Sequence, residues 1–476
     1  MRLRGFDRWA GWLLLCTLAA ACGEGQGGED LPPLGIPQGC NPLAADWDCL
    51  LPFPSDVLLV EDAGLPSGRR ISLSRRAAVV NTNDVLADPT SVHPADGFST
   101  AGPILVLFPG GVDDADLVFH TGDLSVSLTP RSPTVLLRAD TGEPVLHFAE
   151  LDPLAEEDAR RVMFIRPLVP LAHGTRYVVG IHGLRDRDGA LVPAPEGFRR
   201  IRDGQAGAHP VLRPLAARYE QDVFAVLEAF GVGRKGLQLA WDFTTGTEEH
   251  VTGDMLAVRR QVIDLLEQDP PVVTIDEVTD EVDEHIFRRI DGTIRVPLFM
   301  DSPEPGARLH RDPAGQVEAN GDTVVAFTVL IPRSVAAAAP DDPPARLLQY
   351  GHGFFGFHAK DSEIARISRM FDQAGFVFVG MDWWGMCVHD VGDIVEAIAN
   401  RPSEMMVFTD RVHQGMANLI AMTFAARGPL LEEHALRIGP DPLYDPDHIY
   451  FYGLSQGHIL GGTYVETPGV LGPWQS

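Results

Sequence analysis

A run of strand-forming residues leads directly into a serine that is flanked by glycines. Residues Ile449–Tyr452 are apolar or aromatic, and Gly453-Leu454-Ser455-Gln456-Gly457 follows them at once. From Gln456 a helix can continue through Ile459, Leu460 and Tyr464. A turn that raises a serine Oγ above a sheet crowds its neighbours, so the flanking positions must lack a Cβ. The run therefore predicts a strand, a sharp turn at Ser455 and a helix that begins behind it.

A second loop lies about 100 residues earlier and complements this turn. The strand-like run Leu347–Tyr350 ends in Gly351-His352-Gly353-Phe354. A helix N-terminus and a glycine loop both present backbone N–H groups, and together they can stabilise a developing negative charge. We therefore expect the two loops to face each other at one edge of a sheet.

Residues 285–476 resemble the first part of an α/β-hydrolase domain of the esterase/lipase kind. The matching motifs are the His352-Gly353 loop, the Met381–Gly385 segment (Met-Asp-Trp-Trp-Gly) and the turn at Ser455. The resemblance implies that Ser455 is a nucleophile and that the N–H groups of Gln456 and Phe354 form an oxyanion hole. His352 and Gly353 would shape the oxyanion loop. It also implies a small-molecule or lipid ester as substrate, an acyl-serine intermediate and no cofactor.

The chain departs from that family after the serine. The family orders its triad as Ser, then Asp or Glu, then His, but here the last histidine is His458 and the last acid is Glu466. Without a base, a serine hydroxyl is a weak nucleophile. We therefore expect a C-terminally truncated hydrolase that is inactive or impaired as it stands. The alternative is a non-catalytic surface lipoprotein that uses the hydrolase-like scaffold for binding or structure.

Upstream groups are the remaining candidates for a base or an acid: His352, His358, His389, His413, Asp382 and Asp390. His352 is expected to lie nearest to the serine, although its ordinary role would be to shape its loop. Asp382 is expected to cap the segment that follows its strand. No histidine pair stands at metal-ligand spacing beside an acid, so we expect no metal site.

The pattern of the chain divides it into a β-rich region, a helical connection and an α/β region. For 285–476 it predicts the α/β class, with a partial α/β-hydrolase parallel sheet of about five strands. The expected strands are 292–300, 323–331, 347–350, 376–381 and 449–452, and the expected helices are 361–373 and 403–426. Before it, 40–205 predicts a β-sandwich-like domain, with strands at 104–108, 125–128, 134–138, 162–166 and 176–183. The connecting region 206–284 shows helical periodicity at 210–230 and 248–267 around a strand at 237–244.

The first 22 residues have the pattern of a bacterial lipoprotein signal peptide. Arg2, Arg4 and Arg8 precede an apolar stretch that ends in Leu18-Ala19-Ala20-Ala21-Cys22. We expect export, lipidation at Cys22 as the membrane anchor, and a flexible tether over 23–39. The expected location is the cell envelope, at the outer membrane or the cell surface. Cleavage without lipid, which would leave a periplasmic or secreted protein, is the alternative.

The cysteine spacing agrees with export, and the net charge argues against one class of partner. Cys40 and Cys49 can close a small disulfide ring in an oxidising compartment, and Cys387 reads as a buried apolar thiol. The net charge of −28 argues against nucleic acid as a partner. The segment Leu51–Asp56 (Leu-Pro-Phe-Pro-Ser-Asp) resembles the N-terminal regions of exported bacterial proteins of the virulence-factor lipase kind.

Overall fold

The computed structural model describes residues 34–44, 49–207, 209–339, 341–359, 361–437 and 442–466. The expected signal peptide, Cys22 and most of the tether lie outside the described residues. Within the described ranges, no helix combines the length and the apolar character that crossing a bilayer requires.

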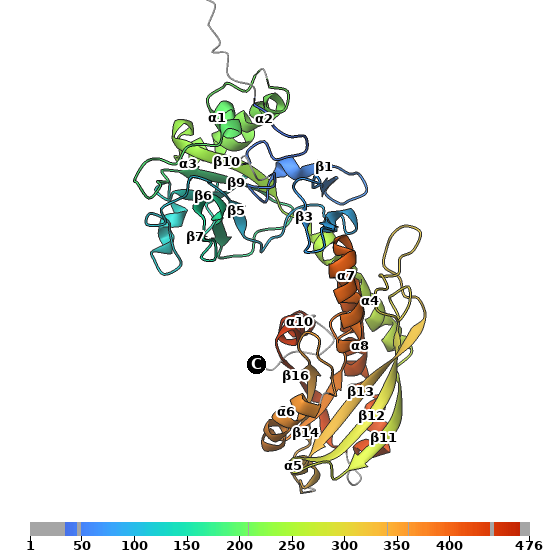
Figure 1. Cartoon of the computed structure of the whole chain (residues 1–476). Helices are drawn as coiled ribbons and strands as arrows, with labels where there is room; N and C mark the ends of the chain where they lie inside the picture. Colours follow the sequence, from blue (N-terminus) through green and yellow to red (C-terminus); the bar gives the residue numbers. More distant parts are fainter. Residues whose placement is uncertain are drawn as a thin grey trace, which may run out of the picture. The chain divides into compact units, whose positions relative to one another are not determined.

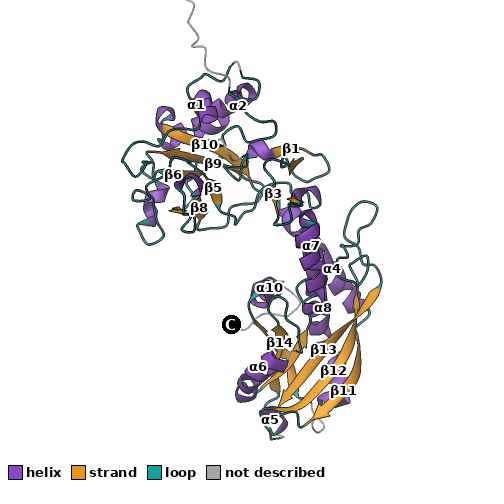
Figure 2. Cartoon of the chain, viewed as in Figure 1, coloured by secondary structure: helices purple, strands orange, loops and turns teal. Residues whose placement is uncertain are grey.

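A six-stranded mixed sheet organises the second half of the chain (Figures 1 and 2). Its strands, in spatial order, are β11 (Val272–Asp280), β12 (Ile286–Pro297), β13 (Asp322–Pro332), β15 (Phe376–Met381), β14 (Ala345–Gly351) and β16 (Tyr444–Gly453). Strand β14 pairs parallel with both β15 and β16, whereas the other neighbours are antiparallel. The prediction of a mostly parallel sheet therefore holds for three strands only, and the sheet begins at Val272, ahead of residue 285.

The degree of burial explains which strands could be predicted from the sequence. Strands β14 and β15 are buried over almost their whole length, as parallel strands covered on both faces are. Strand β11 is mostly exposed at the edge of the sheet and carries charged residues between its apolar ones. Its pattern therefore lacked the apolar run that marked the inner strands.

Helices cover both faces of this sheet. On one face α4 (Glu248–Gln268) and α8 (Phe408–Arg427) pack against the core of β12, β13 and β15. On the other face α6 (Asp361–Ala374) packs its Ile364, Ile367 and Phe371 against β14 and β15. The other α-helices in the described part of this half are α5 (Arg333–Ala336), α7 (Val391–Asn400), α9 (Pro429–Glu432) and α10 (Gln456–Val465). The carboxyl ends of β14, β15 and β16 meet at one edge, because these three strands are parallel.

The first half of the chain holds two three-stranded antiparallel sheets. One orders β5 (Ile104–Val106), β8 (Met163–Pro167) and β7 (His147–Leu151), and the other β10 (Leu237–Thr244), β9 (Arg176–His182) and β6 (Thr134–Arg138). Among the described residues of this half, the other strands form two ribbons, β1 (Leu59–Glu61) with β2 (Arg69–Ile71) and β3 (Val79–Val80) with β4 (Leu86–Ala87). Strand β10 lies in the expected connecting region, yet it is an edge strand of the second sheet.

One local prediction for this half is wrong. The expected strand 125–128 is a 3-10 helix, Leu124–Leu128, because Asp123 accepts hydrogen bonds from the backbone N–H and the hydroxyl of Ser125. The helix expected at 210–230 is present as a continuous helical run over 212–230, in which a π-helical turn, Glu220–Phe224, joins α2 (Leu212–Tyr219) to α3 (Ala225–Phe230). A further helix, α1 (Glu196–Arg202), precedes them.

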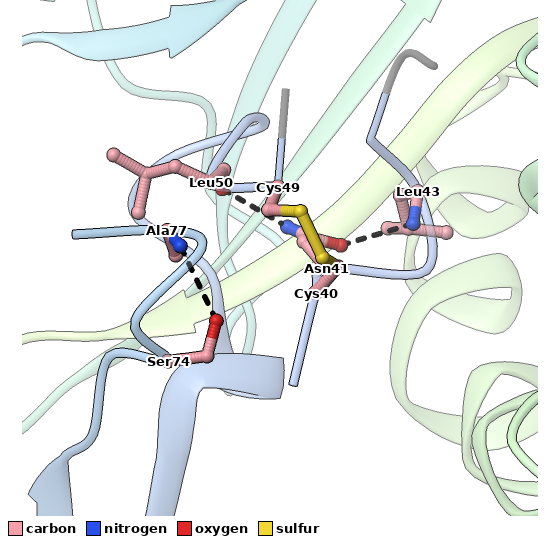
Figure 3. Close-up of a disulfide and its surroundings, with 7 residues drawn as sticks. All are labelled: Cys40, Asn41, Leu43, Cys49, Leu50, Ser74 and Ala77. Carbon is pink, nitrogen blue, oxygen red and sulfur yellow. Dashed lines mark hydrogen bonds between the residues drawn. A yellow bond between two sulfur atoms is a disulfide. The ribbon is translucent and has the colours of Figure 1, made fainter. Parts of the chain in front are cut away.

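A disulfide joins Cys40 to Cys49, with their Cα atoms 4.4 Å apart (Figure 3). The buried Asn41 beside it donates from its side-chain amide to the carbonyl oxygens of Leu50 and Pro52. Its side-chain oxygen accepts from the Leu43 N–H at 3.0 Å. These bonds hold the start of the Leu51–Asp56 segment, and the Trp241 indole N–H fixes the Pro54 carbonyl oxygen at 2.8 Å.

The same segment carries Asp56 into a cluster of buried charges. The Asp56 side chain is only 4% exposed and accepts from the Thr244 hydroxyl at 2.8 Å. Asp242, which is 1% exposed, accepts from both Arg218 and Arg176. Burial, together with the nearby charge of Asp242, raises the pKa of Asp56 to about 6, against the opposing effects of Thr244 and Arg218.

This pKa predicts the effect of Asp56→Asn on stability. A carboxyl whose pKa is raised on folding binds its proton more tightly in the folded state. The contribution of Asp56 to the free energy of unfolding therefore falls as the pH rises from about 4 to about 6, by up to about 3 kcal/mol. Asn mimics the protonated form, so the variant should gain stability relative to the wild type across this window. Urea unfolding of both proteins between pH 4 and 7 measures the difference.

The control is Asp62→Asn, which removes a carboxylate from the partly exposed pair with Arg70. A wild-type minus Asp56→Asn difference that stays constant between pH 4 and 7 would contradict the raised pKa.

Candidate active site

Ser455 occupies a strained turn between β16 and α10. Its φ is 51° and its ψ is −124°, a region that residues other than glycine rarely adopt. Strand β16 ends at Gly453 and α10 begins at Gln456, so the turn is as short as the sequence predicted. Ser455 is exposed, which leaves its hydroxyl open to a substrate.

The flanking glycines are required by close backbone contacts. A Cβ on Gly457 would lie 2.3 Å from the carbonyl oxygen of His352 and 2.4 Å from that of Gly351. A Cβ on Gly453 would lie 2.5 Å from the Gly457 carbonyl oxygen. One turn further along α10, a Cβ on Gly461 would lie 2.0 Å from the Phe451 ring. Helix α10 can therefore press its first two turns directly against the ends of β14 and β16.

Three buried polar side chains connect α10 to its neighbours β14 and α8. The Tyr464 hydroxyl donates to the side-chain oxygen of Gln349 on β14 at 2.6 Å, and it also contacts the Thr423 hydroxyl on α8. The Gln349 amide donates to Thr423 at 3.1 Å. All three side chains are fully or almost fully buried, so these bonds connect α10, β14 and α8 in a low-dielectric interior, where they are strong.

The loop after β14 lies beside the serine, as the sequence predicted. A Cβ on Gly353 would lie 3.3 Å from the Ser455 Cβ and 3.9 Å from its Oγ. In the described part of the chain, neither the Phe354 N–H nor the Gln456 N–H has a hydrogen-bond partner. Phe355 adopts a φ of 58°, a second positive value at a residue other than glycine. The turn and the loop thus place two unpartnered donors near one exposed hydroxyl.

His352 is committed to holding this loop. Its Nε2 accepts from the Trp383 N–H at 2.9 Å, so the ring proton lies on Nδ1, which donates to the Gly353 carbonyl oxygen at 2.8 Å. The side chain is 0% exposed. With both ring nitrogens bonded, His352 ties the end of β14 to the end of β15 and is not free to deprotonate Ser455.

Asp382 binds a different histidine. Its carboxylate accepts from the Nδ1 and from the backbone N–H of His358, at 2.7 and 2.9 Å, and His389 approaches it at 3.7 Å. Burial alone would raise the pKa of Asp382, but the hydrogen bond and the charge of His358 lower it below its ordinary value. This pair lies at the end of β15, and β14 separates β15 from the strand of Ser455.

A buried ion pair supports the loop that follows β14. Asp390 accepts from Arg411 at 2.7 Å and from the backbone N–H groups of Gly385 and Cys387. The segment that Asp390 holds is hydrogen-bonded to this loop, because the Phe355 N–H donates to the Met386 carbonyl oxygen at 2.8 Å. Sequence reasoning missed Arg411, since nothing along the chain connects it with Asp390.

The structure places the other candidate residues, His413 and Cys387, in structural roles. His413 bonds to the Thr409 carbonyl oxygen in its own helix. Cys387 is a free, buried thiol, and burial raises its pKa. Among the described residues, no group of three or more His, Cys, Asp and Glu side chains is arranged to hold a metal ion.

Two of the solved structures to which this chain is similar are esterases. A cold-adapted esterase from an Arctic intertidal metagenomic library matches at 19% identity and a TM-score of 0.19, over 36% of this chain and 53% of its own. An acetyl xylan esterase from Paenibacillus sp. R4 matches at 14% identity and a TM-score of 0.24, over 43% of this chain and 52% of its own. The chain thus spans about half the length of each neighbour. No family model and no curated protein matches.

Two alanine substitutions in α10 test the close packing of the turn. Gly457→Ala places a methyl group against the carbonyl oxygens of Gly351 and His352, so it should destabilise the chain by about 1–3 kcal/mol. Gly462→Ala, in the same helix, meets no atom within 4 Å. It should stabilise the chain by about 0.5–1 kcal/mol, because alanine favours a helix more than glycine does. Urea unfolding of both variants measures the contrast, and equal effects would contradict the packing described.

Proposed function

We propose that this chain is an exported serine hydrolase of the esterase type, which cleaves carboxylic esters of small molecules or lipids through an acyl-serine intermediate. The observation that carries the proposal is the backbone conformation of Ser455. It is a non-glycine residue at positive φ between a strand and a helix, with the unpartnered N–H groups of Gln456 and Phe354 close by. Backbone strain of this kind persists where the geometry itself performs a function.

In the proposed reaction, Ser455 Oγ attacks the ester carbonyl carbon and its proton passes to a base. The carbonyl oxygen becomes an oxyanion, which accepts hydrogen bonds from the Gln456 and Phe354 N–H groups. When the intermediate collapses, the bond to the alcohol oxygen breaks and the alcohol leaves with the proton. Water then attacks the acyl-serine, releasing the acid and restoring the Ser455 hydroxyl.

The proton transfer needs a base that the described contacts do not supply. In the described part of the chain, no histidine hydrogen-bonds the Ser455 hydroxyl, and both ring nitrogens of His352 are engaged elsewhere. Loss of the base from such a site typically costs several powers of ten in rate, while the oxyanion donors still act. This observation favours a second candidate function, a scaffold that binds an ester or a related ligand without turning it over.

Covalent labelling tests whether Ser455 is the nucleophile. A fluorophosphonate probe should label the peptide that contains Ser455, and Ser455→Ala should abolish the label. The matched control is Ser334→Ala, which changes an exposed serine in α5 that bonds to the Asp372 carbonyl oxygen. Mass spectrometry of the digested protein locates the label.

Labelling and turnover together separate the two candidate functions. Label at Ser455 with hydrolysis of a p-nitrophenyl ester supports the enzyme. Label at Ser455 without hydrolysis supports the binding scaffold. If a folded wild-type chain takes up no label at Ser455 during prolonged incubation, the assignment of the nucleophile is wrong.

Export and lipid anchoring are part of the proposal. Their support is the basic, apolar and small-residue pattern before Cys22, together with the Cys40–Cys49 disulfide, which suits an oxidising compartment. Cys22→Ser should abolish incorporation of labelled palmitate in a bacterial host and release the protein from the membrane fraction. Cys16→Ser, within the same apolar stretch, is the control and should keep both. Lipid incorporation that survives in Cys22→Ser would refute the assignment.

A further inference from the structure

A stripe of exposed apolar residues runs from the loop beside Ser455 onto one face of α7. Its members are 37% to 55% exposed: Phe354, Phe355, Val388, Val395 and Ile398. Single exposed apolar residues are common on proteins, whereas a contiguous set of them marks a binding surface. The proposed reaction uses the Phe354 N–H and assigns nothing to these side chains.

Two backbone hydrogen bonds make the stripe continuous, because they join the loop to the segment that leads into α7. The Phe355 N–H donates to the Met386 carbonyl oxygen at 2.8 Å, and the Val388 N–H donates to the Gly356 carbonyl oxygen at 2.9 Å. Val388 therefore lies beside the loop, in the 3-10 turn directly before α7. The rings of Phe354 and Phe355 lie against each other, with their centroids 4.2 Å apart.

Helix α7 continues the stripe on one of its faces. Val395 and Ile398 are three positions apart, so they lie on the same face of the helix, and both are exposed. The acidic residues Asp393 and Glu396 lie on another face, where both pair with Arg401. From its first residue to Ile398 the helix extends for about 10 Å, which gives the stripe room for several methylene groups.

The position of the stripe beside Ser455 identifies its occupant. Phe354 supplies both an exposed ring of the stripe and the N–H that would bind the ester carbonyl oxygen, so a group bonded to that carbonyl carbon begins at the stripe. The side chains of the stripe are hydrocarbon, so they bind an apolar group. An acyl chain meets both conditions. It also stays on the serine through both steps of the reaction, whereas the alcohol leaves after the first.

We infer that the stripe binds the acyl chain of the ester, so that the substrates are esters of carboxylic acids whose chain is long enough to reach α7. This inference rests on the proposed function, because it takes Ser455 and the Phe354 N–H as the reacting end of the site. A methylene group that is fully buried tightens binding about fourfold. An open stripe buries only part of each group, so the effect per methylene group should be smaller.

Equilibrium binding to the Ser455→Ala chain tests the inference without turnover. The probes are methyl butanoate and methyl octanoate, which differ only in the length of the acyl chain, and saturation-transfer NMR titrations measure their affinities. Methyl octanoate should bind on the order of tenfold more tightly, because its additional methylene groups contact the stripe. Val395→Ser and Ile398→Ser, each in the Ser455→Ala chain, should reduce this preference about threefold and leave the binding of methyl butanoate unchanged.

The matched control is Val251→Ser, which makes the same exchange on α4 at a valine of nearly the same exposure, 58% against 55% for Val395. It should keep the preference for methyl octanoate. Ile459→Ser is a second comparison, because Ile459 is an exposed residue of α10 soon after Ser455. All four substituted residues are more than half exposed, so these variants should fold.

Equal affinity for the two methyl esters overturns the inference, as does a preference that survives when Val395→Ser and Ile398→Ser are combined. A preference that only Ile459→Ser removes would place the chain along α10 and overturn it too. The same holds if Val395→Ser keeps the preference and instead dissociates a dimer in sedimentation, because the stripe would then be an interface between copies of the chain.

Turnover of p-nitrophenyl butanoate and octanoate by the wild type tests the hydrolase separately. If neither ester is cleaved while the Ser455→Ala chain still prefers methyl octanoate, the catalytic proposal fails and the acyl-chain site stands. If both are cleaved and the Ser455→Ala chain binds the two methyl esters equally, the hydrolase stands and the inference about the stripe fails.

Discussion

The contact between the start of α10 and the end of β14 controls the geometry of the candidate active site. The carbonyl oxygens of Gly351 and His352 lie where a side chain on Gly457 would begin, so the helix approaches the strand at the closest distance a backbone allows. That approach forces the chain to reverse within a single residue, and the positive φ of Ser455 is the result. It also sets the direction of the Gln456 N–H and brings Gly353 beside the Ser455 side chain. The strain at one serine is thus maintained by packing at its two neighbours.

The loop that follows β14 is held in place by groups that do not contact Ser455 in the described hydrogen bonds. His352 joins the end of β14 to the Trp383 N–H at the end of β15, and the Arg411–Asp390 pair fixes the segment that bonds to Phe355. A buried ion pair adds little net stability, because desolvation offsets its attraction, but it selects one arrangement over others. Here the pair is 5% and 2% exposed, and it helps to hold a loop in which the Phe354 N–H is left without a partner among the described residues. Preorganised donors of this kind stabilise a developing charge without rearranging during the reaction.

Local patterns in the sequence predicted the parts of the fold that depend on local interactions. The strand 134–138, the strand 376–381 and the helix that follows residue 361 were found because their periodicity reflects burial on known faces. The turn at Ser455 was predicted because glycines at both flanking positions indicate a backbone too crowded for a Cβ. Edge strand β11, the antiparallel pairing of β13 with β15, and the role of Arg411 were missed, since each depends on partners distant in the chain. The prediction of a strand at 125–128 was wrong because of a local interaction. The hydrogen bond that the Asp123 side chain accepts from the Ser125 N–H outweighed the β propensity of the neighbouring residues.

The unpartnered donors beside Ser455 are informative because of where they lie. Several buried side-chain atoms elsewhere in the described residues also lack a partner within the chain, so a missing hydrogen bond does not by itself mark a site. The Gln456 and Phe354 N–H groups differ from those atoms because both lie near one exposed hydroxyl, in a turn and a loop that other groups hold in place. Donors arranged in this way suit a transient oxyanion, because they need not rearrange as the charge develops.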